Sequence, residues 1–117
     1  MTASDFLRVD LAEQCRDFTG EVNKVYQHLP WASKNEAVAR LKRQVERLSR
    51  EVREAQDSRN RAQTRKRLEE ALGLVHECVP LMSLCLRKVL LSPELHDRWV
   101  ARLDLLEGQL NEWLRAC

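Results

Sequence analysis

The chain has 117 residues, of which 44% are hydrophobic and 32% are charged, and it contains only three glycines and three prolines. This length fits one domain, and the few Gly, Pro and aromatic residues exclude a sandwich or barrel of many short strands. No apolar run approaches the roughly 20 residues of a membrane span, and the N-terminus lacks the basic and apolar regions of a signal peptide. We therefore expect a single domain, residues 1–117, in a cytoplasmic protein without a membrane-bound part.

The first predicted helix covers residues 5–29. Its apolar residues recur in alternating steps of four and three, which is typical of one stripe on an α-helix. The stripe consists of Leu11, Cys15, Phe18, Val22, Val25 and Leu29. We expect Ser4 or Asp5 to cap the start of this helix and Pro30 to end it, because the residue before a proline avoids the α region.

The second predicted helix covers residues 34–56, after a capping box made by Ser33 and Glu36. Its apolar stripe is narrow, and charged residues occupy the other positions. The stripe consists of Val38, Leu41, Val45, Leu48, Val52 and Ala55. The polar stretch 56–60 that follows contains no Gly or Pro, so one bent helix through it is an alternative to a break.

The third predicted helix covers residues 60–91 and carries two adjacent apolar stripes. One consists of Leu68, Leu72, Val75, Val79, Met82, Leu86 and Val89, and the other of Ala71, Leu74, Cys78, Leu81 and Cys85. A helix that is apolar over so wide an arc is expected to be the most central one. Pro80 removes one backbone hydrogen bond, and we expect it to kink the helix without breaking it.

The fourth predicted helix covers residues 93–115, with Ser92 as its cap and Pro93 at its first position. Its stripe consists of Leu95, Trp99, Leu103, Leu106, Leu110, Trp113 and Cys117. The two tryptophans either pack in the core or leave an exposed edge for a subunit contact. Four helices joined by short connections predict an all-α fold, an antiparallel up-down four-helix bundle.

The formal net charge of +2 hides an uneven distribution. Residues 34–67 hold twelve Lys or Arg and five acids, a local charge of +7 against −5 for the rest of the chain. Guanidinium groups in a row match the phosphates of RNA or DNA, so this segment predicts contacts to the nucleic-acid backbone. The candidate binding residues are Arg40, Arg43, Arg47, Arg50, Arg59, Arg61, Arg65 and Lys66. The alternative is a solvated face, partly neutralised by the helical pairs Glu46–Arg50, Arg47–Glu51 and Arg50–Glu54.

Catalytic chemistry finds no support in the residue pattern. The four cysteines form no CxxC pair, and no histidine has a Ser, Cys or Asp partner at a diagnostic spacing. The Glu-x-x-His pairs of di-iron bundles do not occur. We therefore expect a protein that is not an enzyme, without catalytic residues, metal ligands or cofactors.

Several segments resemble a known family of four-helix bundles. They are residues 67–73 (RLEEALG), Glu77, residues 90–94 (LLSPE), residues 103–107 (LDLLE) and the pair Trp113–Leu114. The family comprises proteins encoded in intervening sequences of large-subunit rRNA and the accessory variability determinant (Avd) proteins of diversity-generating retroelements. The Arg-rich second helix makes the Avd branch the nearer of the two.

The resemblance implies a homopentamer with a basic surface that binds nucleic acid and associates with a reverse transcriptase. It implies no catalytic activity of the chain itself. The residue pattern alone leaves a second reading open, a structural or protein-interaction bundle that binds no nucleic acid.

Overall fold

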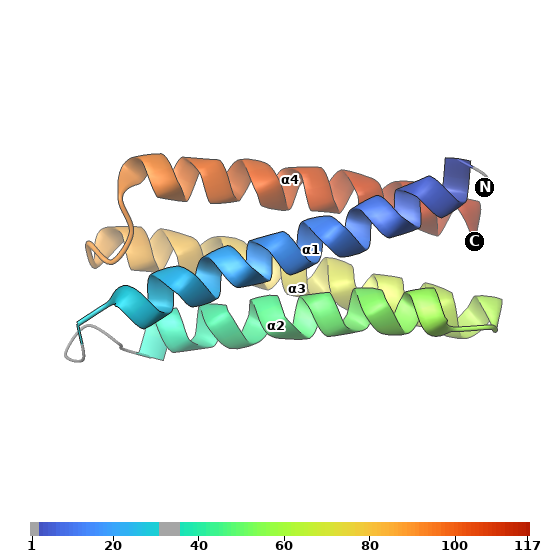
Figure 1. Ribbon diagram of the computed structural model, residues 1–117, viewed down its shortest axis with the longest axis horizontal. Coiled ribbons are helices and arrows are strands. Elements are labelled where there is room, and N and C mark those ends of the chain that lie inside the picture. Colours follow the sequence, from blue (N-terminus) through green and yellow to red (C-terminus); the bar gives the residue numbers. More distant parts are fainter. Residues whose placement is uncertain (1–2, 31–35) are drawn as a thin grey trace.

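The protein is an antiparallel bundle of four helices (Figure 1). The computed structural model describes residues 3–30 and 36–117, and this part of the chain contains no strand. The helices are α1 (Ala3–His28), α2 (Glu36–Asp57), α3 (Arg61–Arg87) and α4 (Pro93–Ala116). They form a rod 45 Å long, and the predicted all-α, up-down four-helix bundle is confirmed. None of the helices in the described ranges has an apolar stretch that could traverse a membrane.

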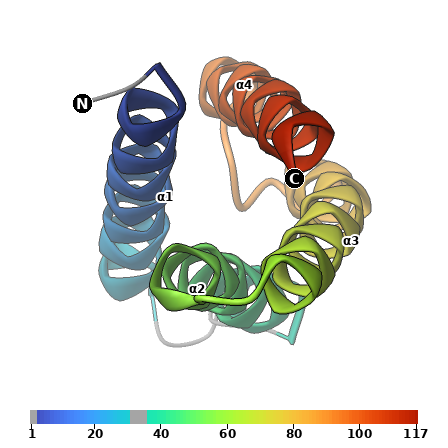
Figure 2. The same cartoon turned by 90° about the vertical axis from the view of Figure 1, so that its right-hand side faces the viewer.

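Viewed along the bundle, the four helices form a ring in which they follow one another in chain order (Figure 2). Each contacts its two neighbours, α4 closes the ring against α1, and the diagonal pairs make no backbone contact among the described residues. The expectation that α3 is the most central helix is therefore wrong. The stripe Ala71, Leu74, Cys78, Leu81 and Cys85 is buried, because α2 covers one flank of α3 and α4 covers the other. The other stripe is buried only in part, and its residues Val79 and Val89 are exposed.

The helix boundaries differ from the predicted ones where capping decides them. α1 begins at Ala3, so Ser4 and Asp5 lie inside the helix instead of capping it. The capping residue predicted for α2, Ser33, lies outside the described residues. α2 and α3 are separate helices because Asn60 caps α3, its Oδ1 accepting hydrogen bonds from the N–H groups of Ala62 and Gln63 at 2.8 and 3.3 Å.

α3 passes through Pro80 without a break, as expected, but ends at Arg87 instead of residue 91. The N–H of Leu90 donates to the carbonyl of Cys85 at 2.9 Å, and the N–H of Val89 donates to that of Leu86 at 3.0 Å. This is the Schellman arrangement, which places Val89 at the left-handed position with φ 60°. A β-branched residue is strained in this conformation, which glycine adopts freely. The sequence shows no glycine at this point, and its apolar stripe therefore predicted the helix end too late.

Replacing Val89 by glycine is expected to stabilise the protein by about 0.5–1 kcal/mol. The left-handed conformation costs a non-glycine residue about 1–2 kcal/mol, and the added freedom of glycine in the unfolded chain offsets part of that gain. The side chain is 87% exposed, so little packing is lost. Urea unfolding of wild type and variant measures the difference. Val79→Gly is the matched control inside the same helix and should destabilise by about 1 kcal/mol; a destabilised Val89→Gly protein would contradict the strain at this turn.

Both tryptophans of α4 lie in the core. Trp99 and Trp113 are each 1% exposed, so neither leaves an edge for a subunit contact, and that alternative is wrong. The ring of Trp99 meets Phe18 of α1 edge to face, with 5.8 Å between the centroids. The guanidinium of Arg8 lies 5.2 Å from the ring centroid of Trp113. Large aromatic side chains therefore fill the space between the first and last helices.

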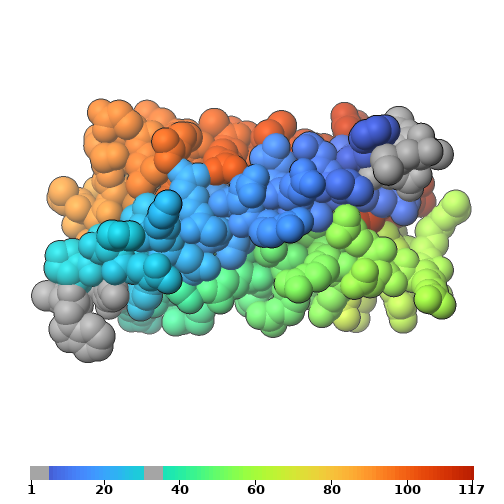
Figure 3. Space-filling model, viewed as in Figure 1, coloured from blue at the N-terminus to red at the C-terminus, as the bar shows by residue number. Residues whose placement is uncertain are grey.

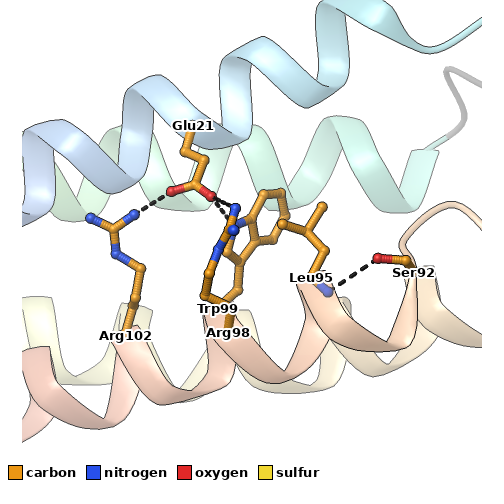
Figure 4. Close-up of polar contacts among 6 residues, drawn as sticks. All are labelled: Glu21, Ser92, Leu95, Arg98, Trp99 and Arg102. Atoms are coloured by element: carbon orange, nitrogen blue, oxygen red, sulfur yellow. Dashed lines mark hydrogen bonds and ion pairs between the residues drawn. The ribbon is translucent and has the colours of Figure 1, made fainter.

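A carboxylate joins α1 to α4 (Figure 4). Glu21 accepts hydrogen bonds from the side chains of Arg98 and Arg102 and from Nε1 of Trp99, the last at 3.2 Å. Partial burial would raise the pKa of the Glu21 carboxyl, but the Trp99 and Arg98 hydrogen bonds and the two arginine charges together lower it below its ordinary value. Glu21 therefore stays ionised at neutral pH and closes the ring of helices.

Candidate nucleic-acid interface

Four arginines form a row on the outer face of α2, which we call the α2 arginine row. Arg40, Arg43, Arg47 and Arg50 are all exposed. The apolar stripe of the same helix is buried on the opposite side, and it consists of Val38, Leu41, Val45, Leu48, Val52 and Ala55. The helical period thus places the row in solvent, as the sequence indicates. Its role in binding stays a prediction.

The acids expected to neutralise the row are engaged elsewhere. Glu46 pairs with Lys42 at 2.6 Å between Oε1 and Nζ. Glu51 and Glu54 both pair with Nη1 of Arg67 on α3, at 3.2 and 3.0 Å. The three expected pairs within α2 (Glu46–Arg50, Arg47–Glu51 and Arg50–Glu54) are absent from the described part of the chain, so that expectation is wrong. These acids lie on the flanks of α2, where a neighbouring cation competes for them.

The row therefore keeps most of its charge free. Among the described residues, no carboxylate oxygen lies within 4.0 Å of a side-chain nitrogen of Arg40, Arg43 or Arg50. Arg47 also has no carboxylate partner among the described residues, and its Nη1 donates to Oε1 of Gln44 at 3.2 Å. Like charges three and four residues apart repel one another, and a polyanion would relieve that repulsion.

The other four candidate residues do not extend the row. Arg59 and Arg61 are exposed at the connection between α2 and α3. Arg65 pairs with Glu69, with 3.2 Å between Nε and Oε1. Lys66 is exposed on α3, in a groove that it shares with several acids. The eight predicted residues thus divide into the α2 arginine row and a second, partly neutralised group on the loop and α3.

Arg47 of the row and Lys66 of the second group line one groove together with acids of α3. The groove between α2 and α3 is lined by Arg47, Lys66, Glu69, Glu70, Gly73, Leu74 and Glu77. Within it, Nε2 of Gln44 donates to Oε2 of Glu77 at 2.7 Å. A polyanion that lay along this flank would meet three glutamates, so the basic surface does not continue from α2 onto α3.

Two arginines that were not among the candidates adjoin the row on its other flank. Arg16 of α1 and Arg53 of α2 line the groove between these helices, and both are exposed. Arg16 lies outside the basic segment 34–67, so the charge count missed it. To predict that Arg16 lies beside α2, one must know which face of α1 packs against α2. The helical period of α1 alone does not give this information.

Three of the four cysteine thiols lie in the core. Burial raises the pKa of the Cys15 and Cys78 thiols to about 12, and burial also raises that of Cys85. These thiols are therefore protonated and inert at neutral pH. Nε2 of His76 lies 3.4 Å from Glu107 on an exposed face. Within residues 3–30 and 36–117, no three His, Cys, Asp or Glu side chains come together as ligands for a metal ion.

No model of a known protein family matches the chain, and no curated protein matches its sequence. The fold does match a solved structure, the crystal structure of a protein of unknown function from the S23 ribosomal protein family of Bacteroides thetaiotaomicron. The two chains are 16% identical, and the match has a TM-score of 0.86 over 93% of this chain and 98% of the other. At this identity the likeness shows a common four-helix fold.

Proposed function

We propose that the protein is a non-catalytic accessory protein that binds the backbone of RNA or DNA in the cytoplasm. It acts as a homo-oligomer, a pentamer by resemblance, beside a reverse transcriptase of a diversity-generating retroelement. The observation that carries the proposal is the α2 arginine row, whose exposed guanidinium groups lack carboxylate partners among the described residues. Guanidinium groups bind phosphate oxygens bidentately, and such contacts carry affinity without base preference.

Two further points support the proposal. The residues quoted above for α3, the turn into α4 and the end of α4 resemble the family of rRNA intervening-sequence and Avd proteins, and the Arg-rich α2 favours the Avd branch. The solved structure with the same fold belongs to a family named for a ribosomal protein, which agrees with RNA as one of the two candidate polymers.

Salt dependence is the direct test of the proposal. A fluorescein-labelled RNA duplex, and a DNA duplex of the same sequence, are titrated with the purified protein and followed by fluorescence anisotropy. Four arginines that each neutralise one phosphate predict an affinity loss of roughly 100-fold between about 50 and 200 mM salt. Undetectable binding of both duplexes at low salt, or an affinity that does not change with salt, would contradict the proposal.

The second candidate function is a bundle that binds only protein. Exposed apolar side chains favour it, namely Phe6, Val9 and Leu105, which are 64%, 46% and 51% exposed. Under this reading, changes in the α2 arginine row leave function intact, and polar substitutions at these three positions abolish it.

A further inference from the structure

The groove between α1 and α2 has the composition of an anion site. It is lined by Ala12, Arg16, Ser49, Arg53 and Gln56, a set that contains two guanidinium groups and no carboxylate. The face on which α1 lies beside α2 is turned toward the viewer in Figure 3. The two arginines come from different helices, so an anion between them can be held from two sides.

Three other grooves in the described ranges contain carboxylates, and a further groove, near Arg115, contains two arginines of which one is already paired with a glutamate. Three glutamates line one groove between α2 and α3, and Glu54 and Asp57 line another. The groove beside Gly20 contains Glu21. The groove near Arg115 contains Arg65, whose charge Glu69 already neutralises.

The polar atoms of the α1–α2 groove are available for a ligand. Arg16 and Arg53 are exposed, and among the described residues neither has a carboxylate within 4.0 Å. The Ser49 hydroxyl forms no hydrogen bond in the part of the chain that the structure describes. Nε2 of Gln56 donates to the backbone carbonyl of Arg8 at 2.9 Å, which fixes the side chain at the end of the groove.

We propose that this groove holds one phosphate of the bound nucleic acid between Arg16 and Arg53, with the Ser49 hydroxyl donating to a phosphate oxygen. The inference rests on the proposed function and adds to it a path for the polymer. The chain of phosphates crosses from the α2 arginine row toward α1, because Glu69, Glu70 and Glu77 repel it on the α3 side. RNA and DNA share this phosphate chemistry, and titrations with both duplexes distinguish them.

The test compares the groove with an equal loss of charge elsewhere. In Arg16→Gln/Arg53→Gln, the slope of log affinity against log salt is expected to fall by about one, because one phosphate loses its contact. Affinity for the labelled duplexes at low salt should fall about tenfold. The control, Arg87→Gln/Arg115→Gln, removes two exposed arginines outside the groove and should leave both quantities nearly unchanged.

The variant Ser49→Ala tests the same site without changing the net charge of the protein. It should weaken binding severalfold without changing the salt slope, since a hydroxyl releases no counterion. Circular dichroism confirms that each variant is folded.

The outcomes separate the two proposals. If the wild-type protein binds neither duplex at low salt, the proposed function fails and this inference fails with it. If binding requires the α2 arginine row and the groove variants bind like wild type, only the proposed phosphate site in the α1–α2 groove is wrong. Equal losses of affinity in the groove and control variants would show that only the net charge matters. A change of about two in the salt slope would mean that Arg16 and Arg53 contact separate phosphates. Either result would contradict a single phosphate held between the two arginines.

Discussion

Replacing Trp99 by alanine is expected to lower the free energy of unfolding by about 3–5 kcal/mol, the range for truncating a fully buried aromatic side chain. The indole is 1% exposed, packs edge to face on Phe18 and donates to Glu21 at 3.2 Å, so the variant loses packing and a hydrogen bond together. Small domains are stable by only about 5–15 kcal/mol, and the variant should be near the limit of folding. Urea unfolding, followed by circular dichroism, measures the loss.

Two phenylalanine variants separate packing from hydrogen bonding. Trp99→Phe keeps most of the apolar surface and removes the donor to Glu21, which should cost about 1–2 kcal/mol beyond the change in volume. Trp113→Phe is the matched control, because Trp113 is equally buried and its Nε1 has no hydrogen-bond partner among the described residues. The control should therefore be the milder change. A Trp99→Ala protein that loses less than about 1 kcal/mol would contradict the close packing of α1 on α4.

Reversing three charges of the α2 arginine row, in Arg40→Glu/Arg43→Glu/Arg47→Glu, is expected to lower duplex affinity at least 100-fold at low salt. Each guanidinium–phosphate contact contributes about 1 kcal/mol or more, and the new carboxylates repel the polymer. The row makes no ion pair with the described residues, so the fold should tolerate the change. Fluorescence anisotropy measures affinity, and thermal unfolding checks that the bundle is intact.

The control for this variant reverses the same number of charges outside the basic segment. Lys24, Lys88 and Arg115 are exposed and lie on other parts of the bundle, so their replacement by glutamate changes the net charge equally. Binding by this control should stay within a fewfold of wild type. If both triple variants lose affinity to the same extent, binding depends on the net charge of the protein and not on the position of the row. Its role as a binding surface is then refuted.

Helical periodicity explains why the fold could be predicted. The stripes of α2 and α4 are buried with little deviation, because steps of three and four residues describe the inner face of any helix in a bundle. The same period places the α2 arginine row in solvent. Those inferences need one helix at a time and no knowledge of its neighbours.

What the sequence could not predict depends on how two helices are rotated against each other. Glu51 can reach either Arg47 on its own helix or Arg67 on α3, and only the packing of α2 on α3 decides for Arg67. The same packing places Glu69 and Glu77 beside Arg47, and the packing of α1 on α2 brings Arg16 beside Arg53. The candidate site therefore extends from α2 toward α1 and not toward α3, because of helix packing that the local sequence pattern does not specify.

The Glu21 contacts also bear on the order in which the ring of helices forms. Contacts between consecutive helices join residues that are close in the chain, whereas Glu21 lies 77 and 81 positions from Arg98 and Arg102. Closing so long a loop loses more chain entropy than pairing neighbours, so α1 meets α4 late in folding. We therefore expect the contact between α1 and α4 to form last, after the consecutive helices have paired.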